Sequence, residues 1–279
     1  MLDPLLVRLG VLSTAQLASI GWSKHARDVA TSRGVLVPVR RGWFARPDAD
    51  ERVAAAVRAG GCVSCATALR LHGAWVPSSL DGNHLRRAAH HRGPSSLAWC
   101  RPHGDVPPVV AAVDDVDVAF RCLLRCGTAE DIVVVADSLL HLRRATPSDL
   151  DRWATVAPRR IRAILTRVDV AESGLESVVR LRLRSRGVTV RTQVWIGARR
   201  VDLLVGELLV IECDGAEHHA SWDAHAADRA RDRALTAQGY LVVRVTYRQI
   251  LDDWPSVERD LLAIIRRGAH RAPKRQHET

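Results

Sequence analysis

Residues 199–219 decide the fold of this chain, and they read RRVDLLVGELLVIECDGAEHH. Two short apolar runs, at 201–205 and 208–211, flank the pair Gly206-Glu207. Apolar runs of this length around a short turn containing glycine are typical of a β-hairpin. The sequence therefore predicts two paired strands joined by a tight turn.

Acidic side chains stand where these two strands begin and end. Asp202 lies at the start of the first strand, and Glu212 and Asp214 lie at the end of the second. A strand pair brings such positions together across the ladder, which can form a site for a hard divalent cation. His218 and His219 follow at once, as candidates for a general acid, a general base or a phosphate contact. Converging acids followed by histidines in a basic chain predict metal-assisted phosphodiester hydrolysis.

The composition favours a nucleic-acid partner. The 279 residues carry a formal net charge of +10, and lysine occurs only at Lys24 and Lys274, so the positive charge is almost all arginine. Arginine binds phosphate through a planar fork, although a GC-rich genome would also replace lysine by arginine. No apolar run reaches about 18 residues and no signal pattern opens the chain, so we expect a cytoplasmic protein without membrane contact.

Residues 1–48 are predicted to form a winged helix-turn-helix domain. Ser13 to Gln16 resembles a capping box that opens one helix, and a second helix follows from Lys24 to about residue 33. Residues 35–45 then read as two strands with an arginine tip. The second helix of such a domain enters the major groove, although small winged helices also bind proteins. The candidate DNA contacts here are Lys24, His25, Arg27, Arg40 and Arg41.

Residues 49–168 are predicted to form a middle α/β region that carries no catalytic pattern. Helices are expected over 51–59, 64–71 and 129–142, and a strand over 116–120. The six cysteines of the chain are scattered, as is typical of reduced cytosolic thiols. The pairs Cys62-x-x-Cys65 and Cys122-x-x-x-Cys126 invite a zinc interpretation, but the small residues around the first pair favour close helix packing instead.

Residues 173–268 are predicted to form a C-terminal domain, and residues 269–279 a basic, flexible tail. The expected elements are a helix over 175–186, a strand over 189–196, the acidic hairpin, a helix over 224–238, a β-rich run over 240–246 and a helix over 255–267. The whole chain is thus expected to be an α/β (α+β) protein.

The motifs of this C-terminal domain resemble one family of enzymes. They are Glu176-Ser177, Gln193, Val201-Asp202, Ile211-Glu212-x-Asp214-Gly215-x-x-His218, Asp228-Arg229-x-Arg231-Asp232, Gly239-Tyr240 and Val243-Arg244-Val245-Thr246. In this order they resemble the endonuclease-like family related to the very short patch repair endonuclease, in the PD-(D/E)xK restriction-endonuclease-like superfamily. The resemblance implies a mixed sheet flanked by helices, a bound Mg²⁺ (or Mn²⁺) and cleavage of DNA.

The resemblance also implies roles for individual residues. Asp202 would be the principal metal ligand, Glu212 the second acid and Glu176 the acid on the first helix. His218 and His219 match a histidine-bearing turn that stands in place of the superfamily's lysine. Because the domain contains no lysine, a lysine-dependent mechanism is excluded.

The first 170 residues resemble a different group of proteins. Gly42-Trp43-Phe44 after the predicted wing and Leu71-His72-Gly73 after a helix of small residues are similar to the antitoxins of type IV toxin–antitoxin systems. In those antitoxins a winged helix is followed by a second domain. The two halves together resemble fusion proteins found in actinobacteria.

Each candidate residue also has a purely structural alternative. Glu176 is the N3 residue of a capping box begun by Ser173. Asp202 lies inside an apolar strand, where a carboxylate needs a metal ion, hydrogen bonds or an ion pair with Arg199 or Arg200. Asp214 can be a turn residue, and arginines on the 224–238 helix can form local ion pairs. The further candidate DNA contacts are Arg199, Arg200, Arg229 and Arg231.

These patterns together predict a magnesium-dependent DNA endonuclease that is targeted by its N-terminal winged helix. Two alternatives stay open: a DNA-binding transcriptional regulator or antitoxin with an inactive nuclease fold, and a nuclease that cleaves RNA. DNA is the expected partner, a homodimer is compatible with the sequence, and no protein partner is indicated.

Overall fold

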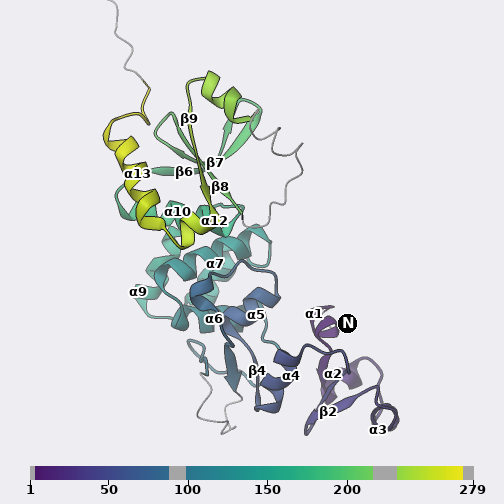
Figure 1. The fold of residues 1–279 in the computed structure, drawn as a ribbon. Coiled ribbons are helices and arrows are strands. Elements are labelled where there is room, and N and C mark those ends of the chain that lie inside the picture. The colour runs from purple at the N-terminus through teal and green to yellow at the C-terminus, as the bar shows by residue number, and fades with distance from the viewer. Residues whose placement is uncertain (1–3, 88–98, 216–230, 273–279) are drawn as a thin grey trace, which may run out of the picture. The chain divides into compact units, whose positions relative to one another are not determined.

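The computed structural model describes residues 4–87, 99–215 and 231–272. The chain divides into two compact units, the first unit Met1–Thr166 and the second unit Arg167–Thr279, and each is considered by itself (Figure 1). In the described ranges, every helix is too short or too polar to cross a bilayer.

The first unit begins with helices and a small antiparallel sheet. The elements are α1 (Pro4–Leu9), β1 (Val11–Ser13), α2 (Thr14–Ser19), α3 (Lys24–Ser32), β2 (Val37–Arg40) and β3 (Trp43–Ala45). Strands pair in the order β1-β3-β2, and Ser13 forms the predicted capping box with Gln16. Leu17, Ala30 and Leu36 form the core of this segment, because one apolar side of each helix turns toward the sheet.

The rest of the first unit is mainly helical. Its elements are α4 (Glu51–Arg58), β4 (Gly61–Val63), α5 (Cys65–Leu71), the 3-10 turn η1 (Ser78–Leu80), β5 (Leu85–Arg87), α6 (Val116–Cys126), α7 (Ala129–His141), α8 (Pro147–Ala154), α9 (Arg159–Arg162) and the 3-10 turn η2 (Ala163–Arg167). The strand expected over 116–120 is wrong, because these residues begin helix α6. Its buried residues Phe120, Leu123 and Leu124 recur at helical spacing, and burial of that face overrides the strand preference of the valines.

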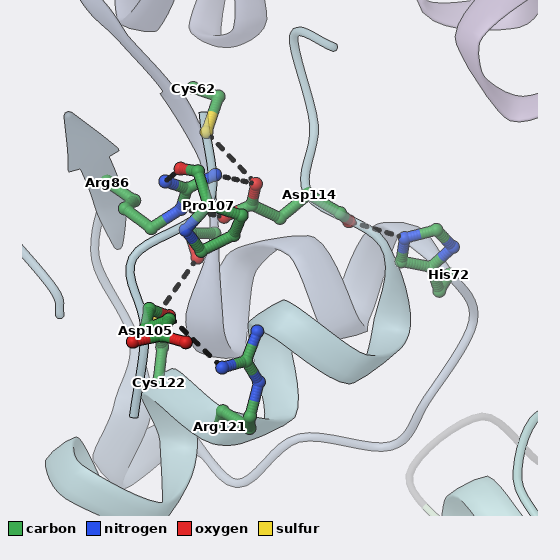
Figure 2. A network of polar contacts seen from close by, with 9 residues as sticks. Cys62, His72, Arg86, Asp105, Pro107, Asp114, Arg121 and Cys122 are labelled. Carbon is green, nitrogen blue, oxygen red and sulfur yellow. Dashed lines mark hydrogen bonds and ion pairs between the residues drawn. The ribbon is translucent and has the colours of Figure 1, made fainter. Parts of the chain in front are cut away.

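A buried ion pair connects β5 to the segment before α6. Arg86 donates to both carboxylate oxygens of Asp114 at 2.6 Å, and its third nitrogen donates to the carbonyl of Pro107 at 2.7 Å (Figure 2). His72 contacts the Asp114 carbonyl at 2.9 Å, and Cys62 donates to the Asp114 carboxylate at 3.3 Å. The bidentate geometry and these extra bonds satisfy both charges away from water.

The second unit contains a four-stranded mixed sheet. Its elements are α10 (Gly174–Ser185), β6 (Val190–Ile196), β7 (Arg199–Val205), β8 (Leu209–Asp214), β9 (Leu241–Thr246), α12 (Tyr247–Leu251) and α13 (Trp254–Arg266). The order is β6-β7-β8-β9, antiparallel except for the parallel pair β8 and β9. Helix α10 packs on β6 and β7. Residues 231–237 are also helical, and Leu235 packs against a core that includes Val201, Leu204 and Val210.

The predicted hairpin is confirmed, and the predicted tail is corrected in part. Strands β7 and β8 pair through Leu203 with Ile211 and Val205 with Leu209, and Gly206 takes the positive φ of 61° that the turn requires. The backbone amides of Glu207 and Leu208 donate to the carbonyl of His270, and the His270 residue is only 8% exposed. The start of the predicted tail, at 269–272, is therefore hydrogen-bonded to the hairpin turn, and the remainder lies outside the described residues.

Candidate functional site

The hairpin brings its two acidic ends together, as its sequence predicts. The pairing of Leu203 with Ile211 puts Asp202 beside Glu212 at the next position of the ladder. The carboxylate of Asp202 accepts a hydrogen bond of 2.8 Å from the backbone amide of Cys213. This bond fixes the Asp202 side chain across the strand pair and leaves one of its two carboxylate oxygens for another partner.

A third acid reaches the same place from the first turn of α10. Glu176 is only 3% exposed, and its backbone amide donates to the Ser173 hydroxyl at 3.2 Å. The Glu176 carboxylate accepts from the Glu172 amide at 3.1 Å and from the Gln193 side chain at 2.6 Å. The serine half of the predicted capping box therefore forms, while the glutamate side chain turns toward β6.

Gln193 holds an unusual backbone conformation at this point of β6. It lies between the pairs Thr192 with Leu203 and Val194 with Val201, opposite Asp202, and has a φ of 52°. A positive φ is costly for a residue with a side chain, and such strain concentrates at functional sites. In this conformation the Gln193 amide donates to the Glu176 carboxylate.

We call Glu176, Asp202 and Glu212 the acid cluster, and the charge of Asp202 disfavours ionisation of the other two. Burial and the charge of Asp202 raise the pKa of Glu176, and burial raises the pKa of Asp202. Burial and the charge of Asp202 also raise the pKa of Glu212 to about 7. Burying several carboxylates together is unfavourable unless protons or a cation compensate their charge. The all-oxygen donor set is the one that Mg²⁺ and Mn²⁺ prefer.

Asp214 belongs to an ion-pair network at the edge of the acid cluster. Arg244 on β9 donates to Asp214 at 2.8 Å and makes a two-pronged pair with Asp232 at 2.8 and 3.0 Å. The charge of Arg244 also acts to lower the pKa of both Asp202 and Glu212. The sequence contains Arg244 in a motif but indicates no role for it. The β8–β9 register places Arg244 opposite Glu212, where its positive charge acts on the acids.

The arginines before Asp202 do not form the ion pair that the sequence left open. Within the described ranges, Arg200 pairs with Glu172 and stacks over Trp195 at 5.8 Å, while Arg199 donates to the carbonyl of Arg231 at 2.9 Å. Asp202 is therefore held by the backbone and not by a neighbouring arginine. His218, His219 and Arg229 lie outside the described residues.

The DNA-contact candidates of the first unit lie on α3 and on the β2–β3 hairpin. Lys24 and His25 are exposed on the first turn of α3, and Arg40 and Arg41 are exposed at the hairpin tip. Arg27 is half-buried instead, because its guanidinium donates to the carbonyl of Trp22 at 2.7 Å. Four of the five candidates are therefore exposed to solvent.

Comparison with known proteins identifies one part of the chain. No curated protein matches the sequence. Residues 175–265 match the restriction-endonuclease-like family model REase_MTES_1575, and this range includes α10, the whole mixed sheet and the acid cluster. The second unit therefore contains a restriction-endonuclease-like domain, which indicates a nuclease.

Proposed function

We propose that the protein is a metal-dependent DNA endonuclease whose active site is the acid cluster. The observation that carries the proposal is that Asp202 lies beside Glu212 on the β7–β8 pair of a restriction-endonuclease-like domain, with Glu176 of α10 near enough for the charge of Asp202 to raise its pKa. Glu176 is buried, Asp202 and Glu212 are half-buried, and all three have a raised pKa, which is typical of functional sites and is a condition that a bound cation would relieve.

Asp202 and Glu212 would hold the divalent cation, with Glu176 as a further ligand. A bound Mg²⁺ or Mn²⁺ supplies a Lewis acid that lowers the pKa of water and offsets charge on the phosphate. Gln193 positions the Glu176 carboxylate, and the Cys213 amide positions that of Asp202. The charge of Arg244 supports ionisation of Asp202 and Glu212, so it takes part of the electrostatic role of a lysine that the domain lacks.

Two further parts of the proposal concern the proton and the DNA. His218 and His219 would accept or donate the proton, because histidine changes its charge near neutral pH. Residues 1–48 would act as a winged helix that presents Lys24 and His25 to the major groove and the β2–β3 tip to phosphates. Their order of helices and strands and the exposure of those side chains support this arrangement.

A cleavage assay tests the proposal. Wild type and Asp202→Asn are incubated with supercoiled, linear, mismatched and single-stranded DNA and with RNA, in Mg²⁺, Mn²⁺ or EDTA. Asp260→Asn is the matched control, since Asp260 is an exposed acid of the same unit. We expect metal-dependent DNA products from wild type and the control, and none from Asp202→Asn.

Other results would favour the alternatives. Cleavage confined to RNA would identify a ribonuclease. Equal DNA binding by wild type and Asp202→Asn without products in any metal would favour a regulator whose nuclease fold is inactive.

A further inference from the structure

Four metal-ligating side chains of the first unit converge although they come from separate segments. Cys65 is the first residue of α5, His84 precedes β5, Cys100 follows Trp99, and Cys126 is the last residue of α6. One ligand atom from each lies within 4.8 Å of all the others. We call these four residues the cysteine–histidine cluster.

The separations in this cluster match those between ligands of one tetrahedral ion. Zinc–sulfur bonds of about 2.3 Å and zinc–nitrogen bonds of about 2.0 Å place two sulfurs about 3.8 Å apart, and a sulfur and a nitrogen about 3.5 Å apart. The Cys126 and Cys100 sulfurs are 3.6 Å apart, and the Cys100 sulfur is 3.5 Å from Nδ1 of His84. The sulfur–sulfur distance is too long for a disulfide, and both distances fit a shared ion.

The backbone holds the cluster in place through contacts of its own. The Cys100 amide donates to the carbonyl of Leu85 at 2.7 Å, and the Ser64 amide donates to the carbonyl of His84 at 2.9 Å. The His84 amide donates to the Thr67 hydroxyl at 3.0 Å. The segments bearing Cys65, His84 and Cys100 are thus cross-linked by hydrogen bonds, so the ligands are preorganised.

The sequence spacing groups Cys62 with Cys65 and Cys122 with Cys126, but in the structure only one cysteine of each pair belongs to the cluster. Cys62 and Cys122 turn into the core. Cys62 donates to Asp114 at 3.3 Å (Figure 2), and the Ser64 hydroxyl donates to Cys122 at 3.4 Å. Cys65 and Cys126 turn to the cluster instead. The packing role expected of these thiols applies to Cys62 and Cys122 alone.

We propose that Cys65, His84, Cys100 and Cys126 bind a structural zinc ion. Three thiols and one imidazole are a typical structural zinc set, and four protein ligands complete a tetrahedron without an open position for substrate. The ion would join α5, α6 and the ends of β5, which pairs with β4 in a two-stranded sheet. The site would be independent of the acid cluster, because its ligands all belong to the first unit.

Metal analysis of the full chain, purified under reducing conditions, tests the proposal. Wild type should contain about one zinc per chain by elemental mass spectrometry, as expected of a single structural site. Cys126→Ser should lose most of it, and because Cys126 is exposed this substitution is the least disruptive of the four. Cys122→Ala is the matched control on the same helix and should retain the zinc, since Cys122 is not a cluster member.

Cobalt substitution separates a lost site from a misfolded variant. Replacement of zinc by Co²⁺ in wild type should give the intense visible bands of tetrahedral cobalt bound by thiolates, and Cys126→Ser with unchanged circular dichroism should weaken and shift them. Reduced wild type without zinc and without these bands would overturn the proposal. So would zinc content that Cys126→Ser leaves unchanged, or metal-free protein in which Cys100 and Cys126 form a disulfide.

Discussion

At the scale of single residues, the acid cluster is costly to the stability of the folded chain. Buried carboxylates that repel one another destabilise a folded chain, and apolar residues of similar size would pack there without that cost. Glu176, Asp202 and Glu212 are nevertheless held by directed hydrogen bonds or by the strand register. A group that is costly to the fold and precisely positioned is a candidate for function on physical grounds.

The substitution Asp202→Asn should therefore separate stability from activity. The amide keeps an oxygen for the Cys213 N–H but removes a buried charge. In EDTA at pH 8 the variant should melt at the same temperature as wild type or higher, while DNA cleavage falls by at least about 100-fold, as for loss of a principal metal ligand. Thermal melts and single-turnover cleavage measure both. A large fall in melting temperature would contradict this account.

The raised pKa of Glu212 predicts a specific pH dependence of stability. Its folded pKa of about 7 lies above the ordinary value of 4.5, so the folded state binds the extra proton between those values. Stability from this group is fully present below about pH 4.5 and is lost as pH rises through about 7. Metal-free wild type should lose more stability than Glu212→Gln between pH 5 and 8, as measured by denaturant melts. Saturating Mg²⁺ at pH 8 should stabilise wild type and leave the variant unchanged.

At the scale of elements, the edge strand β6 contributes to the site through its distorted residue. Glycine adopts a positive φ without steric cost, so Gln193→Gly would remove the backbone strain, while Gln193→Ala would retain it. Both substitutions would remove the hydrogen bond to Glu176. The glycine variant should be more stable than the alanine variant by about 1–2 kcal/mol. Both should cleave DNA about 10–100-fold more slowly, as for loss of an outer-shell partner. Equal stability of the two variants would argue against the strained backbone.

The ion pair between β5 and the segment before α6 gives a second prediction at this scale. Asp114→Ala leaves Arg86 buried, 2% exposed, without its carboxylate partner. The loss should be about 3–5 kcal/mol of unfolding free energy, measured in urea. The double variant Arg86→Met/Asp114→Leu should recover much of it, because it removes the buried charges together. No recovery would show that the packing, rather than the charge, decides the cost.

At the scale of the whole molecule, the net charge of +10 bears on DNA binding. Phosphate contacts release counterions, so affinity falls with salt in proportion to their number. If Arg41 at the β2–β3 tip contacts a phosphate, Arg41→Gln should reduce the slope of log affinity against log salt by about 1. Fluorescence anisotropy measures the slope. Arg58→Gln is the matched single-charge control, because Arg58 pairs with Glu51, and an equal effect of both variants would argue against a phosphate contact by the β2–β3 tip.

The amino-acid sequence by itself determined the elements whose signals are local. Spacing, turn chemistry and alternation are local signals that do not depend on distant residues. They predict the hairpin around Gly206, the capped helices α2 and α10 and the acids at the strand ends. The strand expected at 116–120 fails for the opposite reason: valine favours strands locally, but burial along α6 decides.

Only the tertiary structure decided which distant side chains meet. Arg244 joins the acids because β9 pairs with β8 in parallel, a register that no local signal specifies. The cysteine–histidine cluster is the clearer case, since Cys65, His84, Cys100 and Cys126 are separated by 16 to 26 residues along the chain and have no motif spacing in common. Sequence fixes which groups are available, while long-range packing fixes their distances, and a metal site depends on those distances.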